Sequence, residues 1–332
     1  MTAVSPTHRI KSVPEKIGLL LNPTSGQVRK REKAIRKALE QITGAILCEA
    51  TDAPGFIAAT DTLIQSNLDL LVIIAGDGTS HAVLSHLFTI LPVTQWPVLM
   101  IIPGGTTNMT PLDLGMRGKP EKILQRLAQY LQHPDNCNTV KQVQRPVLCI
   151  EQNGQQTIYG MFFATGLVAR GVKFSRSSVK QIGITGGIFT FLIMLRSLIG
   201  LIFTRNNKEW APVTMSITKE NGESFQGTYL FALASALDCL LLNIRPYWGR
   251  EPAPLHVTWV DQQRKHLWRC IWPLLSGKGE QLNAQDGYHS HNGHQLTIQM
   301  DDEYIVDGEL YRSIGNESLH ITATPPIAFL VL

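Results

Sequence analysis

Apolar residues in the first part of the chain come in short continuous runs, and stretches with helical periodicity lie between them. The runs predict strands at 17–21, 45–49, 70–74 and 98–102, the first of them buried. The stretches between and after them predict helices at 29–42, 56–65, 80–87 and 120–131. This alternation is typical of an α/β domain with a parallel sheet and crossover helices.

The pattern changes after about residue 135. Short β-type runs separated by turn residues lie at 140–151, 157–164, 213–219, 228–234, 255–260, 295–300 and 319–323. They predict a mostly antiparallel β-sandwich. We therefore expect an α/β domain over residues 14–135 and a β-rich domain over residues 136–332, in a chain long enough for two cores.

Two of the predicted strands run directly into glycine-bearing loops. The first loop and the start of the next helix comprise Ala75, Gly76, Asp77, Gly78, Thr79, Ser80 and His81, and the second loop comprises Gly104, Gly105, Thr106, Thr107 and Asn108. A strand that ends in such a loop before a helix brings backbone N–H groups and a helix N-terminus to one point. This arrangement suits an anionic ligand such as a phosphate.

Asp77 lies inside the first loop. Beside phosphates a carboxylate is tolerated where it holds a metal cation or takes a proton, so its presence indicates phosphoryl chemistry over passive anion binding. A structural turn acid is the simpler alternative. The sequence has no P-loop lysine motif, no dinucleotide-binding glycine fingerprint after the first strand and no protein-kinase motif.

A weaker loop follows the first predicted strand. It is rich in small hydrogen-bonding residues and precedes a basic helix: Asn22, Pro23, Thr24, Ser25 and Gly26. Together with Asp307-Gly308-Glu309 far downstream, the three loops stand in an order that resembles the diacylglycerol kinase catalytic-domain family. That family includes bacterial lipid kinases and sphingosine and ceramide kinases, with NAD kinases as distant relatives. Each motif is short, but the four together span nearly the whole chain.

The resemblance implies a nucleotide-binding α/β domain followed by a β-rich domain for the lipid substrate, with ATP in the cleft between them. It implies that Glu309 is the general base toward the lipid hydroxyl, and that Asp77 acts through Mg²⁺ and the nucleotide phosphates or shares the proton transfer. A solvated turn is the alternative for Glu309. Thr51, Thr106 and Asn108 match positions that contact the nucleotide, although an N-cap role for Thr51 and turn geometry for the other two are alternatives.

The chain departs from the family pattern in places. Ala75 stands where a glycine is usual, Gly104 precedes Gly105-Thr106 where a leucine is usual, and Met109 stands where an aspartate commonly follows the asparagine. Many bacterial members hold a structural Mg²⁺ at an Asp-Gly turn in the second domain. Residues 245–255 have no such turn, so we expect no structural metal site.

An apolar segment at 182–203 is long enough to suggest a transmembrane helix, but Arg196 would lie near the bilayer centre at a cost of a few kcal/mol or more. We expect instead that residues 188–203 form a lipid-facing helix flanked by Lys180 and Arg205, with packing on the sandwich as an equal alternative.

The stretch 286–294 contains three histidines and an aspartate, which are residue types that can bind a metal. Its Gly/Asn content predicts a loop, so we expect no metal there.

Composition narrows the function further. Apolar residues make up 44% of the chain, charged residues 17%, and the net charge of +4 is spread along it, which does not support nucleic-acid binding. Five cysteines without a C-x-x-C spacing argue against a disulfide framework and a zinc ribbon. Since the N-terminus also lacks the apolar core of a signal peptide, we expect a cytoplasmic protein with peripheral contact at the inner membrane face.

The sequence therefore predicts an ATP- and Mg²⁺-dependent kinase that phosphorylates a hydroxyl of a diacylglycerol- or sphingoid-like lipid. An NAD kinase-like enzyme is one alternative, although a soluble dinucleotide substrate needs no apolar segment such as 188–203. A catalytically silent lipid- or nucleotide-binding protein is the other, suggested by Ala75 and Met109. The presence of both Asp77 and Glu309 argues against it.

Overall fold

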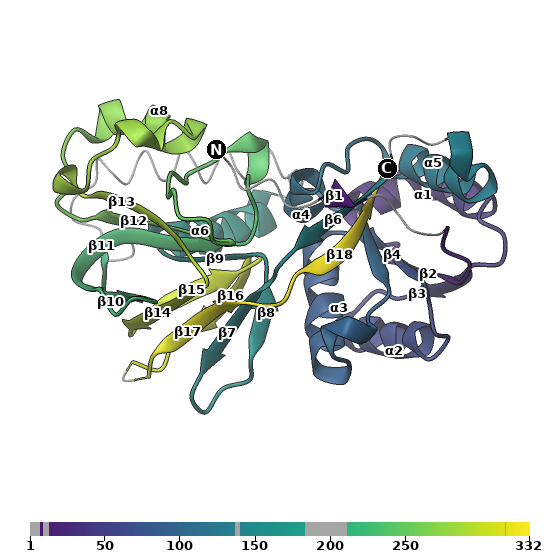
Figure 1. Ribbon diagram of the computed structural model, residues 1–332, viewed down its shortest axis with the longest axis horizontal. Helices are drawn as coiled ribbons and strands as arrows, with labels where there is room; N and C mark the ends of the chain where they lie inside the picture. The colour runs from purple at the N-terminus through teal and green to yellow at the C-terminus, as the bar shows by residue number, and fades with distance from the viewer. Residues whose placement is uncertain (1–6, 9–12, 137–139, 183–210, 316) are drawn as a thin grey trace. The chain divides into compact units, whose positions relative to one another are not determined.

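The structure is a computed structural model that describes residues 7–8, 13–136, 140–182, 211–315 and 317–332 (Figure 1). The segment expected at the membrane, 188–203, lies outside the described residues. Where the chain is described, no helix is both long and apolar enough to cross a membrane. The chain divides into two compact units: an α/β unit that runs to Arg145 and takes up Pro325–Leu332 again, and a β unit of Pro146–Thr324.

The described part of the α/β unit contains a seven-stranded sheet in the order β1-β6-β18-β5-β4-β2-β3. Its strands are β1 (Thr7–His8), β2 (Ile17–Leu21), β3 (Ile46–Glu49), β4 (Leu70–Ala75), β5 (Val98–Pro103), β6 (Lys141–Arg145) and β18 (Ile327–Val331). The neighbours from β18 to β3 run parallel, whereas β6 and β1 add an antiparallel edge. All residues of β2 and β4 are buried, which is why these strands read as continuous apolar runs.

Helices cover both faces of this sheet. They are α1 (Gly26–Leu39), α2 (Ala53–Ile64), α3 (Asp77–Ile90), α4 (Met109–Asp113) and α5 (Pro120–Gln132). Figure 1 shows α1 and α5 on one face and α2 and α3 on the other. The carboxyl ends of β2, β4 and β5 therefore lead into helices at the same edge of the sheet.

The β unit contains an antiparallel sheet with eleven described strands in the order β16-β15-β9-β11-β10-β14-β17-β7-β8, and β12 and β13 branch from β11. The elements are β7 (Leu148–Gln152), β8 (Ile158–Gly160), β9 (Phe162–Gly166), α6 (Leu167–Ile182), β10 (Val213–Lys219), β11 (Ser224–Ser235), β12 (Leu255–Asp261), α8 (Leu267–Ser276), β13 (Tyr288–Gly293), β14 (Gln295–Met300), β15 (Glu303–Val306), β16 (Glu309–Arg312) and β17 (Leu319–Ala323). Short 3-10 turns lie in both units: at Val93–Gln95 and Pro134–Asn136 in the α/β unit, and at Leu241–Asn243, Gly279–Gln281 and Ala284–Asp286 in the β unit.

The long strand β11 shapes this second sheet. Its first half pairs with β10, its second half pairs with β9 and β12, and a register shift lies between Tyr229 and Phe231. The sheet therefore curls into a sandwich-like half-barrel (Figure 1). The expected fold class, a mostly parallel α/β domain followed by an antiparallel β domain, is confirmed.

The two units differ from the expected boundaries. The run predicted at 140–151 is two strands that belong to different sheets, because Pro146 supplies no N–H and separates β6 from β7. The chain crosses back at Pro325, after which β18 enters the first sheet between β6 and β5. The stretch 286–294 was also expected to be a loop, and this was wrong: β13 pairs with β12 over six residues from Tyr288 to Gly293.

Candidate functional site

Three loops meet at the carboxyl edge of the parallel sheet: 22–26 after β2, 76–79 after β4 and 104–108 after β5. Backbone hydrogen bonds join them, from the Gly104 N–H to the Ala75 carbonyl at 2.8 Å and from the Gln27 N–H to the Gly104 carbonyl at 2.8 Å. A Cβ added at Gly105 would lie 2.6 Å from the Gly76 Cα, so the last two loops pack backbone against backbone. Glycine at these positions is what permits this close approach.

The loop after β2 acts as a brace. The Asn22 amide Nδ2 donates to Thr79 Oγ1 at 2.8 Å in a buried contact, and Asn22 Oδ1 accepts from the Thr24 N–H and hydroxyl at 3.0 and 2.7 Å. Ser25 Oγ accepts from the Gly76 N–H at 3.2 Å. Side chains of the first loop therefore hold the start of α3 in place.

This bracing uses most of the donors of the 22–26 loop. The N–H groups of Asn22, Thr24 and Ser25 all bond to acceptors within the α/β unit, and so do those of Gln27 and Val28 directly after the loop. The loop was expected to be a weaker phosphate cradle, and its bonded amides are not available for that task. The Ser25 hydroxyl, which acts as an acceptor in these contacts and keeps its proton, and the support of α3 remain as the contribution of this loop to a ligand site.

The N-terminus of α3 is different. Its N-cap residue, Gly76, has no side chain to cap the helix. The Gly78 and Thr79 N–H groups lie in the first turn, where an α-helix supplies no acceptor, and a Cβ added at Gly78 would meet no atom within 4 Å. The helix dipole adds partial positive charge at the same point. This open, donor-rich turn can accept an anionic oxygen.

Asp77 is the first residue of α3, and its carboxylate reaches the neighbouring loop. Its Oδ2 accepts from the Met109 N–H, the first amide of α4, at 3.1 Å. An acid at this position is also favoured by the dipole of α3. Asp77 therefore has a structural task, since it links the 76–79 loop to the helix that follows the 104–108 loop.

Asn108 closes the third loop on itself. Its backbone is left-handed with a φ of 54°, its Oδ1 accepts from the Gly105 N–H at 2.7 Å, and its Nδ2 donates to the Gly105 carbonyl at 3.0 Å. Asparagine tolerates this backbone conformation better than most residues do. The turn-geometry interpretation of Asn108 thus holds, whereas contact with a nucleotide stays a prediction. Thr106, in the same loop, is exposed beside Gly26.

The structure accommodates two of the departures from the family pattern. Ala75 ends β4 with a buried side chain and a backbone that needs no positive φ, so an alanine fits there. Met109 meets Asp77 through its backbone N–H, a contact that any residue except proline can make. Neither residue disturbs the loop geometry.

Three other predicted residues lie around these loops. Ser80 is buried, and its hydroxyl donates to the Gly76 carbonyl at 3.3 Å, while His81 is half-buried in the next position of α3. Thr51 is exposed after β3. It does not cap α2: the cap is Asp52, which accepts from the Gly55 N–H at 2.9 Å.

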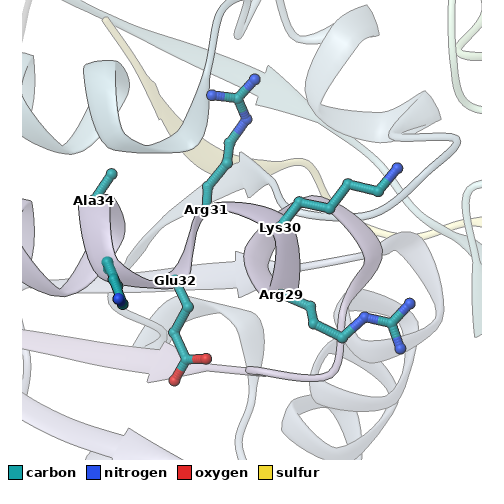
Figure 2. Close-up of a pocket in the computed structure, with 6 residues that line it drawn as sticks. Arg29, Lys30, Arg31, Glu32 and Ala34 are labelled. Atoms are coloured by element: carbon teal, nitrogen blue, oxygen red, sulfur yellow. The ribbon is translucent and has the colours of Figure 1, made fainter.

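The start of α1 carries a group of cations that sequence reasoning did not include in the site. Arg29, Lys30 and Arg31 border a hollow with Glu32, Lys33 and Ala34, at a point where Arg31 leaves helical geometry. Figure 2 shows that the side chains of Arg29 and Arg31 extend from the helix in different directions. Arg31 is paired with Glu121 of α5 at 2.9 Å. Arg29 and Lys30 are exposed near the helix N-terminus, where the dipole disfavours cations. Basic residues in the first turns after a glycine loop are the signal that could have identified them.

Contacts at both ends hold α4, the short helix that follows the 104–108 loop. Asp77 binds its first amide, and at its last residue Asp113 pairs with Arg145 of β6 at 3.2 Å. Both partners of that pair are buried, so removing one would leave a buried charge without its counterion. These two contacts therefore fix the position of α4 next to the 76–79 and 104–108 loops.

Glu309 lies in the β unit. It is the exposed first residue of β16, directly after a two-residue turn in which Asp307 and Gly308 have φ values of 48° and 88°. Asp-Gly is a preferred pair for such a hairpin turn, and β15 and β16 pair antiparallel on either side of it. Burial raises the pKa of Tyr311, two residues further on, and the charges of Glu309 and Asp307 raise this pKa further.

Asp307 itself holds the turn to the neighbouring strands. Its carboxylate accepts from the Met161 N–H at 3.0 Å and from the Phe162 N–H at 2.9 Å. We expect Asp307→Ala to lower the free energy of unfolding by about 1.5–3 kcal/mol, because charged hydrogen bonds to buried amides are lost. Urea unfolding measures this, with the exposed Asp301→Ala as the control. Equal losses of unfolding free energy in the two variants would contradict this stabilising role of Asp307.

Asn22 gives a second stability prediction. Asn22→Ala should lower the free energy of unfolding by about 1–3 kcal/mol, since Thr79 Oγ1 would keep its burial and lose its partner. A double-mutant cycle with Thr79→Val isolates the pair, and we expect a coupling of roughly 0.5–3 kcal/mol from urea titrations. Strictly additive effects would mean that the contact contributes nothing.

Comparison with known proteins gives the context of these loops. Residues 16–139 match the family model described as the diacylglycerol kinase catalytic domain. The resemblance found in the motifs is thereby confirmed. The matched domain is that of a lipid kinase family, and all three loops lie inside it. No curated protein matches the sequence at a significant level.

Solved structures share the fold over nearly the whole chain. Two structures from Bacillus anthracis str. Sterne, each described as a "putative diacylglycerol kinase", have TM-scores of 0.65 and 0.63 at 17% and 19% identity. They cover 95% and 94% of this chain, which in turn covers 96% and 95% of theirs. A third, a diacylglycerol kinase structure from the same organism, has a TM-score of 0.59 at 17% identity, with 97% of this chain and 95% of that chain covered. At these identities the likeness shows the fold.

Proposed function

We propose that this protein is an ATP-dependent kinase that transfers the γ-phosphate to a hydroxyl of a diacylglycerol- or sphingoid-like lipid. The observation that carries the proposal is the open first turn of α3, with Asp77 at its start and two further loops packed against it. An anion-binding helix turn with an acid inside it suits the transfer of a phosphoryl group better than the storage of an anion. The family match over residues 16–139 supports the same reaction class.

In this proposal the residues of the α/β unit position the nucleotide. The Gly78 and Thr79 N–H groups would bind phosphate oxygens, with the hydroxyls of Ser25 and Thr106 beside them. Arg29 and Lys30 would raise the positive potential on the approach to the loops. Phosphoryl transfer needs mainly such positioning and charge neutralisation.

The side chains at the loops suit a Mg²⁺ ion that is bound together with the nucleotide. Among the described residues there is no group of three or more histidine, cysteine or acidic side chains that could hold a metal. Mg²⁺ at phosphoryl sites is commonly bound by one or two carboxylates together with substrate phosphates and water. Asp77 supplies one carboxylate beside the proposed phosphate donors. When bound, the ion would neutralise charge on the phosphates.

Glu309 is the proposed general base. A carboxylate at the start of an exposed strand, on a turn fixed by Asp307, is held in a defined place while it stays open to an acceptor molecule. Its task would be to take the proton of the lipid hydroxyl as the bond to phosphorus forms.

The test is incubation of the full chain with γ-labelled ATP, Mg²⁺ and a total lipid extract, followed by separation of the labelled lipids. A single labelled lipid class would support the proposal and identify the acceptor. NAD in a parallel reaction tests the alternative of an NAD kinase-like enzyme. Label in NADP but in no lipid, or label in neither, would overturn the proposal.

A further inference from the structure

Helix α8 in the β unit presents two tryptophans to solvent. Trp268 and Trp272 are 55% and 71% exposed, and their spacing of four residues places them on one face of the helix. Exposed tryptophan pairs need an explanation, since single scattered apolar residues are normal on a surface but a concentrated pair is not.

The opposite face of α8 is anchored, so the tryptophans are fixed in their outward position. Leu274 is buried, and Cys270 packs on a core cluster that includes Leu167 and Tyr288. The Tyr288 hydroxyl donates to the Lys265 carbonyl at 2.9 Å, just before the helix, and the Arg245 N–H donates to the Leu275 carbonyl at 3.1 Å near its end. Figure 1 shows α8 at the outer side of β12 and β13.

The charged residues of α8 and of the chain on either side of it are mostly basic. From Gln262 to Lys278 the chain contains four lysine and arginine residues and no aspartate or glutamate. They are Arg264, Lys265, Arg269 and Lys278, and Arg269 lies on the helix between the two tryptophans. Three acids border this segment. Asp261 lies 3.3 Å from His289, Glu280 lies 3.7 Å from Arg250, and the backbone carbonyl of Asp286 accepts from the Lys265 N–H, so the net charge of the region is only moderately positive. A surface of this kind is complementary to an anionic one.

We propose that α8 is a membrane-docking helix that lies in the interface of an anionic bilayer, with Trp268 and Trp272 at headgroup depth. Tryptophan prefers this zone, and cations beside it attract anionic headgroups. The helix has ten residues, about 15 Å, which suits an in-plane helix and is too short to span a bilayer.

A protein partner fits less well. Two tryptophans with these exposed fractions offer on the order of 200–300 Å² of contact area. A stable protein interface needs about 800 Å² on each side. Binding to a bilayer requires no minimum contact area of this kind, because the free energies of apolar insertion and of electrostatic attraction to anionic lipids add to each other.

The docking role rests on the proposed function, because a lipid kinase must meet its acceptor lipid at a membrane. The experiment measures vesicle binding separately from phosphoryl transfer. The full chain is floated with vesicles of phosphatidylcholine alone and of equimolar phosphatidylcholine and phosphatidylglycerol. We expect binding to the mixed vesicles, and at least about tenfold weaker binding for the double variant Trp268→Ser, Trp272→Ser. Arg269→Gln should weaken binding to the mixed vesicles by about fivefold, an effect that added salt reduces.

Ile314→Ser is the matched control, since Ile314 is an exposed apolar residue of the same unit at 45% exposure, and its N–H donates to Gln152 of β7. It should bind vesicles like the parent. Parental binding by the tryptophan variant, no binding by the parent, or a parental dimer that the tryptophan variant abolishes in analytical ultracentrifugation would each overturn the docking role.

Activity separates the two proposals. On vesicle-embedded acceptor the tryptophan variant should lose turnover, while on a short-chain soluble acceptor it should keep the parental rate. Loss on both acceptors would overturn the docking role in favour of a structural one. If no lipid is phosphorylated by the parent but vesicle binding depends on the tryptophans, the proposed function fails and the docking surface stands.

Discussion

Replacing Asp77 by asparagine should lower phosphoryl transfer by roughly 100-fold or more without unfolding the protein. The amide oxygen of asparagine can still accept from the Met109 N–H, so the link between the loops is kept. What is lost is the negative charge that would hold Mg²⁺ beside the phosphates. Initial rates with saturating ATP and a short-chain diacylglycerol measure the effect, and urea unfolding checks the fold.

Asp69 offers a matched control at the opposite end of the same strand. Asp77 follows the carboxyl end of β4, whereas Asp69 precedes its amino end and accepts from the Glu15 and Lys16 N–H groups at 2.9 Å. These hydrogen bonds hold the pKa of the Asp69 carboxyl below its ordinary value. Asp69→Asn should therefore cost some stability at neutral pH and leave turnover unchanged. Near-parental turnover of Asp77→Asn would refute the proposed role in phosphate binding.

Glu309→Gln should lower lipid phosphorylation by about 10²–10⁴-fold, the contribution expected of a positioned general base. Glutamine keeps the size and hydrogen-bonding reach of the side chain but cannot take the proton of the lipid hydroxyl. Because Glu309 is assigned to the acceptor side, the affinity for ATP should stay within a few-fold of the parent. Rates on a soluble acceptor and calorimetric titration with a non-hydrolysable ATP analogue separate the two effects.

The control for this variant is Glu223→Gln in the same unit. Glu223 is an exposed glutamate in a hairpin turn, paired with Lys219 at 3.0 Å. The Glu223 side chain is 51% exposed, whereas that of Lys219 is 16% exposed and lies over the Phe225 ring, a contact that the variant keeps. Loss of the pair should therefore cost little stability and leave the rate unchanged. A parental rate for Glu309→Gln would assign Glu309 to a solvated turn, the alternative that the sequence left open.

Sequence reasoning located the elements with strong local signals. The strands at 17–21, 70–74 and 98–102 were found because buried parallel strands are apolar at every position. The glycine loops at their ends and the Asp307-Gly308 turn were found because their backbone geometry restricts the residue types. Predicted helices such as 80–87 began late, since α3 already starts at Asp77 inside the glycine loop.

Elements that depend on distant partners were missed or misassigned. β13 has the composition of a loop, with histidine, asparagine and glycine, yet its pairing with β12 makes it a strand. β18 lies near the end of the chain but completes a sheet built from its first 145 residues, where it pairs with β5 and β6. Nothing near β18 in the sequence specifies these partners.

For the site, the sequence by itself determined which residue types follow each strand, and thereby the family resemblance and the candidate residues. The tertiary structure decided what these residues do in the loops. It assigned the donors of the 22–26 loop to bracing, left the first turn of α3 open, and gave Asp77 the Met109 amide as a partner. The physical reason is that a hydrogen bond between residues such as Asn22 and Thr79, 57 positions apart, depends on how the strands are ordered in the sheet. Local sequence preference sets the turns, whereas the burial of the apolar strands sets which turns meet.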